Sequence, residues 1–422
     1  MSLESLPVEV LLECLYRLPD EDLFRLRRVN QYFRDLLCDE YFWKSRCYFR
    51  FSLLPVIPSD ERLDWRKVHR DAFTLWGFGD FGLCDYIYRL IPCPYPGMNK
   101  IRFRQVANGH NFTVAIDFDH RVWVIGNNTW GQLGTASSNN LQQAVVLKHL
   151  RAIEVAAGNR HTVIRDLDNN VWVAGCTYYD QDQPRQLHRF RMIEGFQAKA
   201  IEAGGHHTLL IDLNDEVYSY GSNVHGQLGL GDTESRNSPT PLGMKAKRVV
   251  AGEEFSAIID LENRLWVCGW NKFGQLGLSF SRYPPFITPN NRIETIPVAL
   301  DIEVKAVACG IDHMVLMDFE GKVWSCGNNN MGQLCLGHSQ NTDRPTKVDL
   351  QFEVKQISTG ALFTVLIDED YRVWTAGTNY FGTLGQGDSH HRAKLQMIKG
   401  MRALSVSTGH THSSLIVLQT DY

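Results

Sequence analysis

Four histidines recur at one position of a repeated sequence unit, and such spacing raises the question of a metal site. The position lies three residues after a glycine, and it is occupied in chain order by Phe112, His161, His207, Phe255, His313, Phe363 and His412. Imidazole is a common metal ligand, but a phenyl ring cannot coordinate a metal. Because Phe replaces His in three copies, the pattern favours a packing or rim role. We predict no metal site and no cofactor.

Six aspartates recur with equal regularity, eight residues after the same glycine. They are Asp117, Asp166, Asp212, Asp260, Asp318 and Asp368. Carboxylates brought together in pairs can act as general acid and base. One aspartate per copy, at the end of an apolar run and before a polar turn, is instead typical of hydrogen bonding within turns. We therefore predict no catalytic residue and a protein that is not an enzyme.

Cysteine usage and charge narrow the class of protein. The ten cysteines form no Cys-x-x-Cys pair, which favours buried, reduced thiols over zinc or redox sites. The formal net charge of −4 gives no reason to expect nucleic acid as a partner. The N-terminal residues lack the basic region and following apolar run of a signal peptide, and there is no run of about 18 apolar residues that could form a membrane-spanning helix. The expected location is cytoplasmic and/or nuclear, without membrane insertion.

The histidines and aspartates belong to a unit that is repeated from residue 106 onward. Its leading glycines are Gly109, Gly158, Gly204, Gly252, Gly310, Gly360 and Gly409, with spacings of 49, 46, 48, 58, 50 and 49 residues. An aromatic residue follows 14 positions after the glycine, at Trp123, Trp172, Tyr218, Trp266, Trp324 and Trp374. Two β-rich runs around a polar turn predict a hairpin in each copy. Small sheets repeated at this period are typical of a β-propeller.

The seventh copy is incomplete, and its missing half lies upstream. After Gly409 the chain continues through one apolar run and ends at Tyr422 without a second strand containing Trp and Gly. Trp76 and Gly79 have the same separation as Trp123 and Gly126. We therefore predict a mainly β fold with seven blades, in which the last blade is shared between the N-terminal and C-terminal segments. Sharing a blade removes free sheet edges.

These residues resemble the regulator-of-chromosome-condensation repeat family over about residues 74–422. The Asp, Trp and Gly offsets and the Gly-Gln-Leu-Gly element at Gly131, Gly226 and Gly274 carry the resemblance. Two copies depart from the family pattern. The second copy has a segment beginning at Cys176 in place of the Gly-Gln-Leu-Gly element, and in the fifth copy the element ends in Cys335 instead of glycine. The resemblance implies a seven-bladed propeller. Founding members of this family act as nucleotide exchange factors for a small GTPase, which gives one alternative function.

Residues 1–50 show helical periodicity instead, and they resemble an F-box, which implies docking on the Skp adaptor. The residues that carry the match, and that we expect at the adaptor interface, are Leu6, Pro7, Val10, Leu11, Leu15, Leu18, Leu23, Val29, Phe42 and Trp43. A helical unit of this size buries little surface alone, so its apolar face is expected to be an interface. A helical bundle that merely caps the propeller is the alternative. Residues 51–73 are predicted to form a helical linker to the propeller at 74–422.

Candidate substrate contacts lie where the repeat is interrupted, because propellers usually bind through loops at one rim. The first interruption is Cys176–Arg191, with Tyr178, Tyr179 and Arg185. The second is an insertion around Phe280–Ile296, with Arg282, Tyr283 and Phe286. An idle surface loop is the alternative for each segment.

Together, the two resemblances imply the substrate-recognition subunit of an SCF-type cullin-RING ubiquitin ligase. The Skp adaptor, and through it the cullin and RING subunits, would be partners, and the propeller would hold a protein target that the sequence does not identify. The alternatives are a regulatory or exchange propeller for a small GTPase and an F-box scaffold that never assembles with a cullin.

Overall fold

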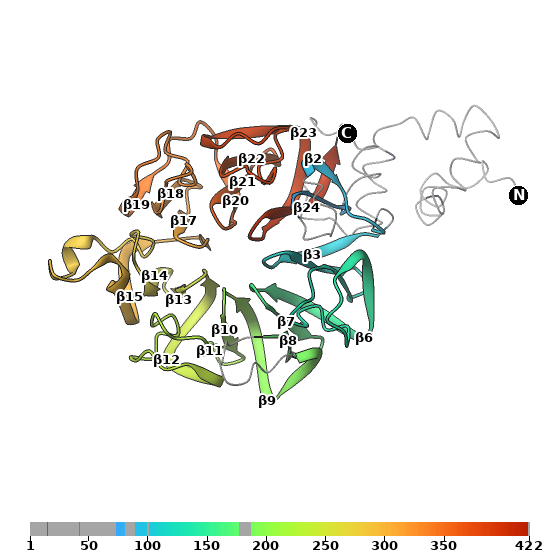
Figure 1. Ribbon diagram of the computed structural model, residues 1–422, viewed down its shortest axis with the longest axis horizontal. Coiled ribbons are helices and arrows are strands. Elements are labelled where there is room, and N and C mark those ends of the chain that lie inside the picture. The colour runs from blue at the N-terminus through green and yellow to red at the C-terminus, as the bar shows by residue number, and fades with distance from the viewer. Residues whose placement is uncertain are drawn as a thin grey trace, which may run out of the picture. The chain divides into compact units, whose positions relative to one another are not determined.

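The computed structural model describes Leu15, Phe42 and residues 73–80, 89–98, 101–176 and 187–420. The chain divides into two compact units, residues 1–72 with 418–422, and residues 73–417. In the first unit, Leu15 and Phe42 are helical and buried. The second unit is a ring of small antiparallel sheets around a central axis (Figure 1). Among the described residues, no helix is long and apolar enough to cross a membrane.

The ring contains seven four-stranded blades, which confirms the predicted fold class. Blades 1 to 3 use β3 (Phe103–Asn108), β4 (Phe112–Asp117), β5 (Arg121–Gly126), β6 (Leu141–Ala157), β7 (His161–Asp166), β8 (Asn170–Gly175), β9 (Leu187–Ala203), β10 (His207–Asp212), β11 (Glu216–Gly221) and the first half of β12 (Arg236–Ala251). Blades 4 and 5 use the second half of β12 with β13 (Phe255–Asp260), β14 (Arg264–Trp270), β15 (Ile293–Glu303), β16 (Ala306–Cys309), β17 (His313–Met317), β18 (Val323–Gly327) and β19 (Thr342–Lys347). Blades 6 and 7 use β20 (Val354–Thr359), β21 (Phe363–Asp368), β22 (Arg372–Gly377), β23 (Arg392–Thr408), β24 (His412–Thr420), β1 (Leu75–Gly79) and β2 (Arg89–Pro94).

The long strands join neighbouring blades. The first half of β6 pairs with β5 as the outermost strand of blade 1, and its second half pairs with β7 as the innermost strand of blade 2. β9, β12 and β23 are used in the same way. A shared strand therefore joins blades 1 and 2, 2 and 3, 3 and 4, and 6 and 7. Apolar side chains fill the space between blades, as with Val124 and Val155 between blades 1 and 2.

Blade 7 is shared between the two ends of the unit, as predicted. Trp76 of β1 pairs with Leu415 of β24, and Gly79 pairs with His412. Phe73, the last residue of the predicted linker, lies in a turn with φ of 66° and belongs to the propeller unit.

A buried polar network ties this shared blade to blade 1. The Asn108 Nδ2 group donates to the Ser407 carbonyl at 2.8 Å, and its Oδ1 accepts from the Thr113 and Ser414 hydroxyls at 2.9 and 2.8 Å. The Tyr95 hydroxyl lies 2.9 Å from Thr113 Oγ1 and 2.6 Å from Ser414 Oγ. Side chains from four segments thus close the ring by hydrogen bonds as well as by strand pairing.

The repeated aspartates fix the turn between the second and third strands of each blade. In blade 1, Asp117 Oδ1 accepts from the backbone N–H groups of Asp119 and Arg121 at 2.9 Å each, and Oδ2 accepts from the Trp123 indole at 2.8 Å. The fourth turn residue, His120, has φ of 61°. These contacts explain why Asp and Trp recur at a fixed separation, and they match the predicted turn role.

The Gly-Gln-Leu-Gly loops and their variants follow the third strand in blades 1, 3, 4, 5 and 6, at the end opposite to the aspartate turns. In blade 1, Asn128 Oδ1 accepts from the Leu133 N–H group at 2.9 Å, which points Leu133 into the core at 0% exposure. Gly131 and Gly134 have φ of 78° and 64°, values that favour glycine. Asn223, Asn271, Asn329 and Asn379 hold the corresponding loops.

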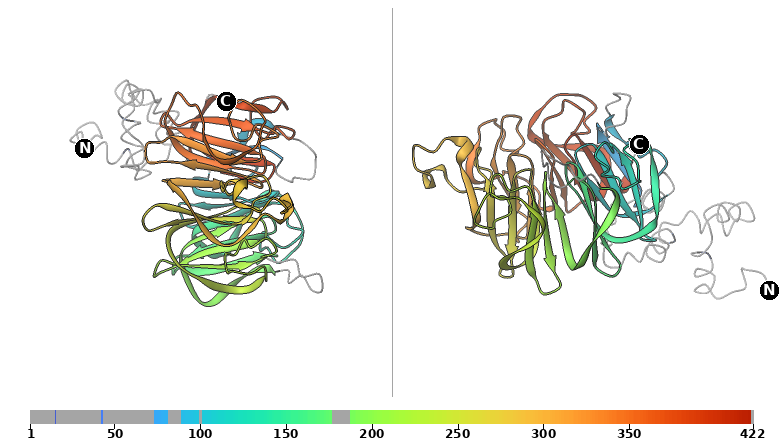
Figure 2. Two further views of the ribbon diagram at one scale, coloured as in Figure 1. Left: turned by 90° about the vertical axis from the view of Figure 1, so that its left-hand side faces the viewer. Right: turned by 60° about the horizontal axis from the view of Figure 1, so that its bottom comes forward.

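The strands run between two faces of the ring, as the edge-on view in Figure 2 shows. We call the face with the aspartate turns the Asp face. The other is the Gly face, which carries the leading glycines, the Gly-Gln-Leu-Gly loops and the insertion between β14 and β15.

Candidate functional site

The leading glycines surround the axis of the propeller at the Gly face. A Cβ atom on Gly158 would lie 2.3 Å from the Gly204 carbonyl oxygen, and one on Gly409 would lie 2.4 Å from that of Gly109. Backbone hydrogen bonds link adjacent blades here, such as Gly205 N–H to the Gly252 carbonyl at 3.1 Å. Only glycine, which has no Cβ atom, permits seven segments of the backbone to approach one another this closely. Beneath this ring, the innermost strands enclose an axial cavity of about 370 Å³.

The His or Phe position packs between blades, and all seven rings are buried. His207 Nε2 lies 2.9 Å from Ser256 Oγ of the next blade, and that hydroxyl donates to the Gln227 carbonyl at 2.7 Å. Because the hydroxyl proton is used for the carbonyl, His207 must donate from Nε2. Burial lowers the pKa of His207 to about 3, so the ring stays neutral.

The same contact recurs around the ring. His161 contacts Thr208 at 3.0 Å, His313 contacts Thr364 at 3.3 Å, and His412 contacts Thr113 at 3.0 Å across the closure. These histidines are thus hydrogen-bonded packing residues. Among the described residues, no group of three or more His, Cys, Asp or Glu side chains is arranged to hold a metal ion.

The axial cavity is lined by the charged residues Glu202, Arg248 and Glu253 of blades 3 and 4, and Glu154 lies close enough to Glu202 to affect its pKa. The Glu154 carboxylate accepts from Arg165 Nε at 2.8 Å, although burial still raises the pKa of Glu154. Burial raises the pKa of Glu202 to about 8, against the opposing effect of Arg248. Cys309 also lines the cavity, and burial raises the pKa of its thiol, so it is not an activated nucleophile.

The loops at the mouth of the cavity differ in chemistry from one side to the other. On one side, the centroids of the His110 and His410 rings lie 4.2 Å apart with the rings tilted by 39°, and burial lowers the pKa of His410 to about 4. On the other side, burial and the neighbouring Glu253 raise the pKa of Glu254 to about 8, and burial raises that of Asp312 to about 6. The mouth therefore combines neutral imidazoles with Glu254, a carboxyl group that holds its proton near neutrality, and with Asp312, whose raised pKa still lies below neutrality.

The insertion between β14 and β15 of blade 4 is a hydrogen-bonded loop that projects from the ring, in yellow in Figure 1. It contains the short helices η2 (Phe280–Arg282) and η3 (Pro289–Asn291). Asp343 of blade 5 accepts from the Phe280 N–H group at 2.7 Å, and the Arg292 guanidinium lies 4.0 Å from the Phe280 ring centroid. These contacts attach the base of the loop to two blades.

The structure places the three predicted residues of this loop together, but in different roles. Arg282 pairs with Glu294 at 2.8 Å, and the Tyr283 hydroxyl accepts from Asn271 Nδ2 at 3.1 Å. Phe286 is 81% exposed. Arg282 and Tyr283 therefore hold the loop in place, while the Phe286 side chain is exposed on its surface.

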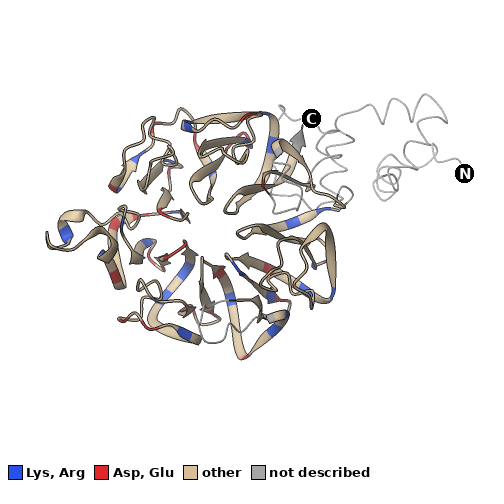
Figure 3. Ribbon diagram, in the orientation of Figure 1, with Lys and Arg blue, Asp and Glu red and all other residues tan. Residues whose placement is uncertain are grey.

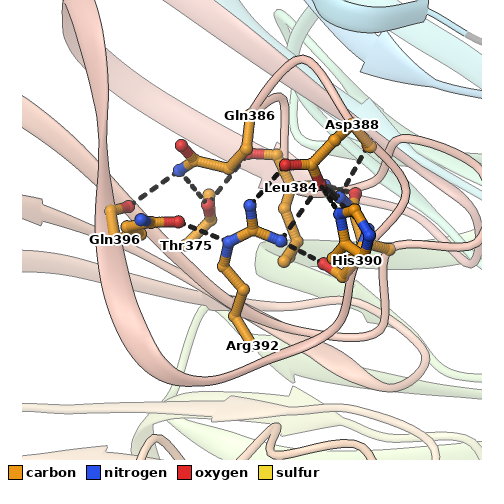
Figure 4. Close-up of polar contacts among 8 residues, drawn as sticks. Thr375, Leu384, Gln386, Asp388, His390, Arg392 and Gln396 are labelled. Carbon is orange, nitrogen blue, oxygen red and sulfur yellow. Dashed lines mark hydrogen bonds and ion pairs between the residues drawn. The ribbon is translucent and has the colours of Figure 1, made fainter.

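Other Gly-face loops are held by ion pairs, as Figure 4 shows for blade 6. Arg392 contacts both oxygens of Asp388, at 3.1 and 2.6 Å, and this guanidinium holds the pKa of Asp388 well below its usual range. Asn379 Nδ2 donates to the Asp388 carbonyl at 2.8 Å. Asp232 and Arg236 form the equivalent pair in blade 3 at 2.6 Å. Exposed aromatic residues such as Tyr380 are thus carried on well-anchored loops.

The remaining predicted contacts lie outside the described residues. For the first interruption these are Tyr178, Tyr179 and Arg185, whereas Leu187–Arg191 of that segment form the start of β9 rather than a loop. For the F-box they are Leu6, Pro7, Val10, Leu11, Leu18, Leu23, Val29 and Trp43. Leu15 and Phe42 are described, and both are buried.

Two further groups of exposed residues escaped the sequence analysis. Arg160 lies over the Trp130 ring at 4.3 Å, and His225 stacks on Trp270 at 4.8 Å, which adds aromatic surface to the Gly face. On the Asp face, the residue after the repeated aspartate is apolar and exposed in five blades. The apolar residues of the Asp face could have been found from their fixed position in the repeat. The aromatic contacts of the Gly face depend on which residues meet in the folded ring.

Comparison with known families now identifies both parts of the chain. The family model "Regulator of chromosome condensation (RCC1) repeat" matches residues 119–165, 214–259, 262–317 and 320–367, and a second model of this repeat matches 198–227, 246–275 and 304–333. An F-box-like model matches residues 3–48. The chain is an RCC1-repeat protein with an N-terminal F-box-like domain. Both resemblances drawn from the sequence are thereby confirmed.

Solved structures show the same fold as this RCC1-repeat propeller. Yeast RCC1 (Prp20) bound to Kap60 has a TM-score of 0.72 and 19% identity, covering 81% of this chain and 88% of that chain. Prp20p from Saccharomyces cerevisiae, described with its binding to Gsp1p and histones, has a TM-score of 0.71, 18% identity and coverages of 82% and 91%. Human WBSCR16 has a TM-score of 0.70, 19% identity and coverages of 81% and 97%.

F-box domains generally bind Skp1, and F-box and RCC1-repeat domains are typically non-catalytic adaptor or regulatory domains. The geometry of the propeller fits this description. Its buried histidines and aspartates hold the blades together, and its exposed aromatic residues lie on anchored loops.

Proposed function

We propose that this protein is the substrate-recognition subunit of an SCF-type cullin-RING ubiquitin ligase. The observation that carries the proposal is the F-box-like match at residues 3–48 in one chain with an RCC1-repeat propeller. The F-box would recruit the Skp adaptor, and through it the cullin and RING subunits. The propeller would hold the protein target, and chemistry would occur on another subunit. This function predicts a cytoplasmic or nuclear location.

The Gly face is the proposed substrate-binding face. It carries Phe286 at the tip of an insertion attached to two blades, with Tyr380 and Val224 exposed on neighbouring loops. Rigid aromatic side chains lose little conformational entropy on binding and are enriched where proteins bind one another. Each Gly-face loop differs from the others in sequence, so this face can distinguish one target from another.

The test is affinity purification from eukaryotic cells with mass spectrometry, using variants that separate the two functions. Leu6→Ala with Pro7→Ala should lose the adaptor and cullin and keep the propeller-bound proteins. Phe286→Ala should keep the adaptor and cullin and lose target proteins. Ile296→Ala is the matched control, because it removes an exposed apolar side chain from β15 outside the loop. Absence of adaptor and cullin from the intact chain would refute the ligase proposal.

The alternatives predict different results. An F-box scaffold would retain the adaptor without any cullin. An exchange or regulatory propeller, which the fold likeness to yeast RCC1 favours, would accelerate nucleotide release from a small GTPase in a fluorescence assay. A ligase receptor predicts no acceleration.

A further inference from the structure

A row of apolar side chains on the Asp face repeats from blade to blade. The residue after the repeated aspartate is Phe118, Leu167, Leu213, Leu261 or Phe319 in blades 1 to 5, and Glu369 in blade 6. We call these five apolar residues the turn-tip array. They are 43% to 56% exposed, even though the adjoining aspartates are largely buried. Isolated exposed apolar residues are common on proteins, but the same position in five consecutive blades forms a surface.

The array is presented rigidly, because each turn has the same two backbone hydrogen bonds to its aspartate. In blade 4, Asp260 Oδ1 accepts from the N–H groups of Glu262 and Arg264 at 2.9 Å each, and Oδ2 accepts from the Trp266 indole at 2.9 Å. The fourth turn residue has positive φ in every one of these blades, such as 70° at Asn263. The second residue of each turn therefore points away from the blade in the same way, and little entropy is lost when it binds a partner.

The turns are also acidic. Counted from the repeated aspartate to the fourth residue after it, each of the six turns has a negative formal charge. Asp119, Glu262 and Glu320 are 71%, 66% and 70% exposed beside their apolar neighbours. Each forms an ion pair with the basic residue of its own turn, which is Arg121, Arg264 or Lys322. These turns remain negative because the repeated aspartate adds a second carboxylate to each. The cations in these turns are partly neutralised, since Arg121 and Arg264 pair with the buried aspartates at 2.6 and 2.8 Å.

Basic residues from neighbouring strands reduce this negative charge, and Lys247 at the Leu261 carbonyl and Arg402 at the Asp370 carbonyl help to neutralise the turns of blades 4 and 6. The six turns together remain negative. Lys199 pairs with Asp215, and Lys355 lies 3.9 Å from Glu369. Figure 3 shows basic and acidic residues interspersed over the blades rather than collected in one band. The exposed turn tips thus combine apolar side chains with carboxylates.

We propose that the Asp face binds a basic amphipathic segment of a partner protein. Apolar residues of the segment would pack against the turn-tip array, and its Lys and Arg side chains would meet the turn carboxylates. Five half-exposed side chains supply only a few hundred Å², less than the roughly 800 Å² per partner of a stable protein interface, which disfavours a second copy of this chain. The negative turns disfavour nucleic acid and anionic lipid. This site is independent of the proposed ligase function.

The probe is a fluorescein-labelled Leu/Lys peptide with helical amphipathic spacing, titrated with the full-length protein by fluorescence anisotropy. We expect binding that weakens about tenfold in a Leu213→Ser, Leu261→Ser variant, as for interface residues in the centre of a site. Glu262→Gln with Glu320→Gln should weaken binding about threefold at low salt and flatten its salt dependence. Val224→Ser with Phe286→Ser is the control, because these apolar residues of the Gly face are more exposed than Leu213 and Leu261.

Several results would overturn this proposal. A Leu/Glu peptide or a scrambled Leu/Lys peptide that binds as well would show that neither charge nor spacing is recognised. Equal losses in the Asp-face and Gly-face variants would show unspecific adsorption. A dimer in sedimentation velocity that Leu213→Ser with Leu261→Ser disperses would assign the face to a second copy. Thermal unfolding checks that the exposed substitutions leave the fold intact.

Discussion

Asn108→Ala should open the polar closure of the propeller while leaving its strand pairing in place. The Asn108 side chain makes three buried hydrogen bonds, to Ser407, Thr113 and Ser414. The corresponding residues of blades 2 to 4 are alanines, Ala157, Ala203 and Ala251, so the backbone tolerates alanine at this position. The variant therefore reports on the hydrogen bonds alone.

The expected loss follows from these three bonds. Each contributes about 1 kcal/mol net, and the Ser407 carbonyl loses the amide donor, which gives about 3 kcal/mol in total. For the propeller unit, residues 73–417, an unfolding entropy of about 2 cal/mol/K per residue gives ~0.7 kcal/mol/K. The melting temperature should therefore fall by about 4 °C, and the urea midpoint should fall with an unchanged slope.

Thr359→Ala is the matched control at the same repeat position in blade 6. Thr359 is 9% exposed, and its hydroxyl has no hydrogen-bond partner. Removing an unsatisfied hydroxyl offsets the loss of one buried methyl group, so the melting temperature should change by less than about 1 °C. Circular dichroism during heating and urea titration measures both variants. Equal small shifts for Asn108→Ala and Thr359→Ala would refute the role of this network in closing the ring.

Two further variants test the turn and the axial cavity. Tyr218→Trp should give Asp212 the indole donor that the other repeated aspartates have, and should raise the melting temperature by about 1 °C. A melting temperature below that of the wild type would mean that Phe196, whose ring lies 5.0 Å from the Tyr218 ring, leaves no space for the larger indole. Burial raises the pKa of Glu202 to about 8. Between about pH 5 and pH 8 the folded state therefore retains a proton that the unfolded state has released, so the free energy of unfolding falls as the pH rises through this range. Glu202→Gln should remove this loss of stability. The urea midpoint of the variant, relative to that of the wild type, should therefore increase between pH 5 and pH 9. A difference between the two midpoints that does not change with pH would contradict the assignment.

The blade architecture was predictable because each repeat contains its own local interactions. Asp117 and Trp123 are six residues apart, and the bond between them lies within one hairpin. Sequence spacing therefore reports it directly. The shared last blade followed from the same spacing, since Trp76 and Gly79 supply the half that the seventh copy lacks. Local periodicity of this kind survives changes in the residues between the fixed positions.

Contacts between blades were not predictable in the same way. His161 meets Thr208, 47 residues away, and Arg160 meets Trp130 across a blade boundary. The burial that raises the pKa of Glu202 also depends on the closed ring. The Asp-face array was present in the repeat as an apolar residue after five of the six aspartates, but alternation alone does not tell an exposed turn residue from a strand residue. Its exposure becomes evident only when the turn hydrogen bonds are seen.

The two faces of the propeller differ in what they can recognise. On the Gly face each blade has its own loop sequence, and the insertion around Phe286 occurs in one blade, so a partner meets a different set of groups at every position. On the Asp face the turn-tip array repeats one apolar residue and one carboxylate, so a segment can shift by one blade and find similar contacts. Specificity is a difference between affinities, and repeated contacts create little of it. We therefore expect the Gly face to select the target, while the Asp face raises the local concentration of basic partners that the Gly face does not distinguish.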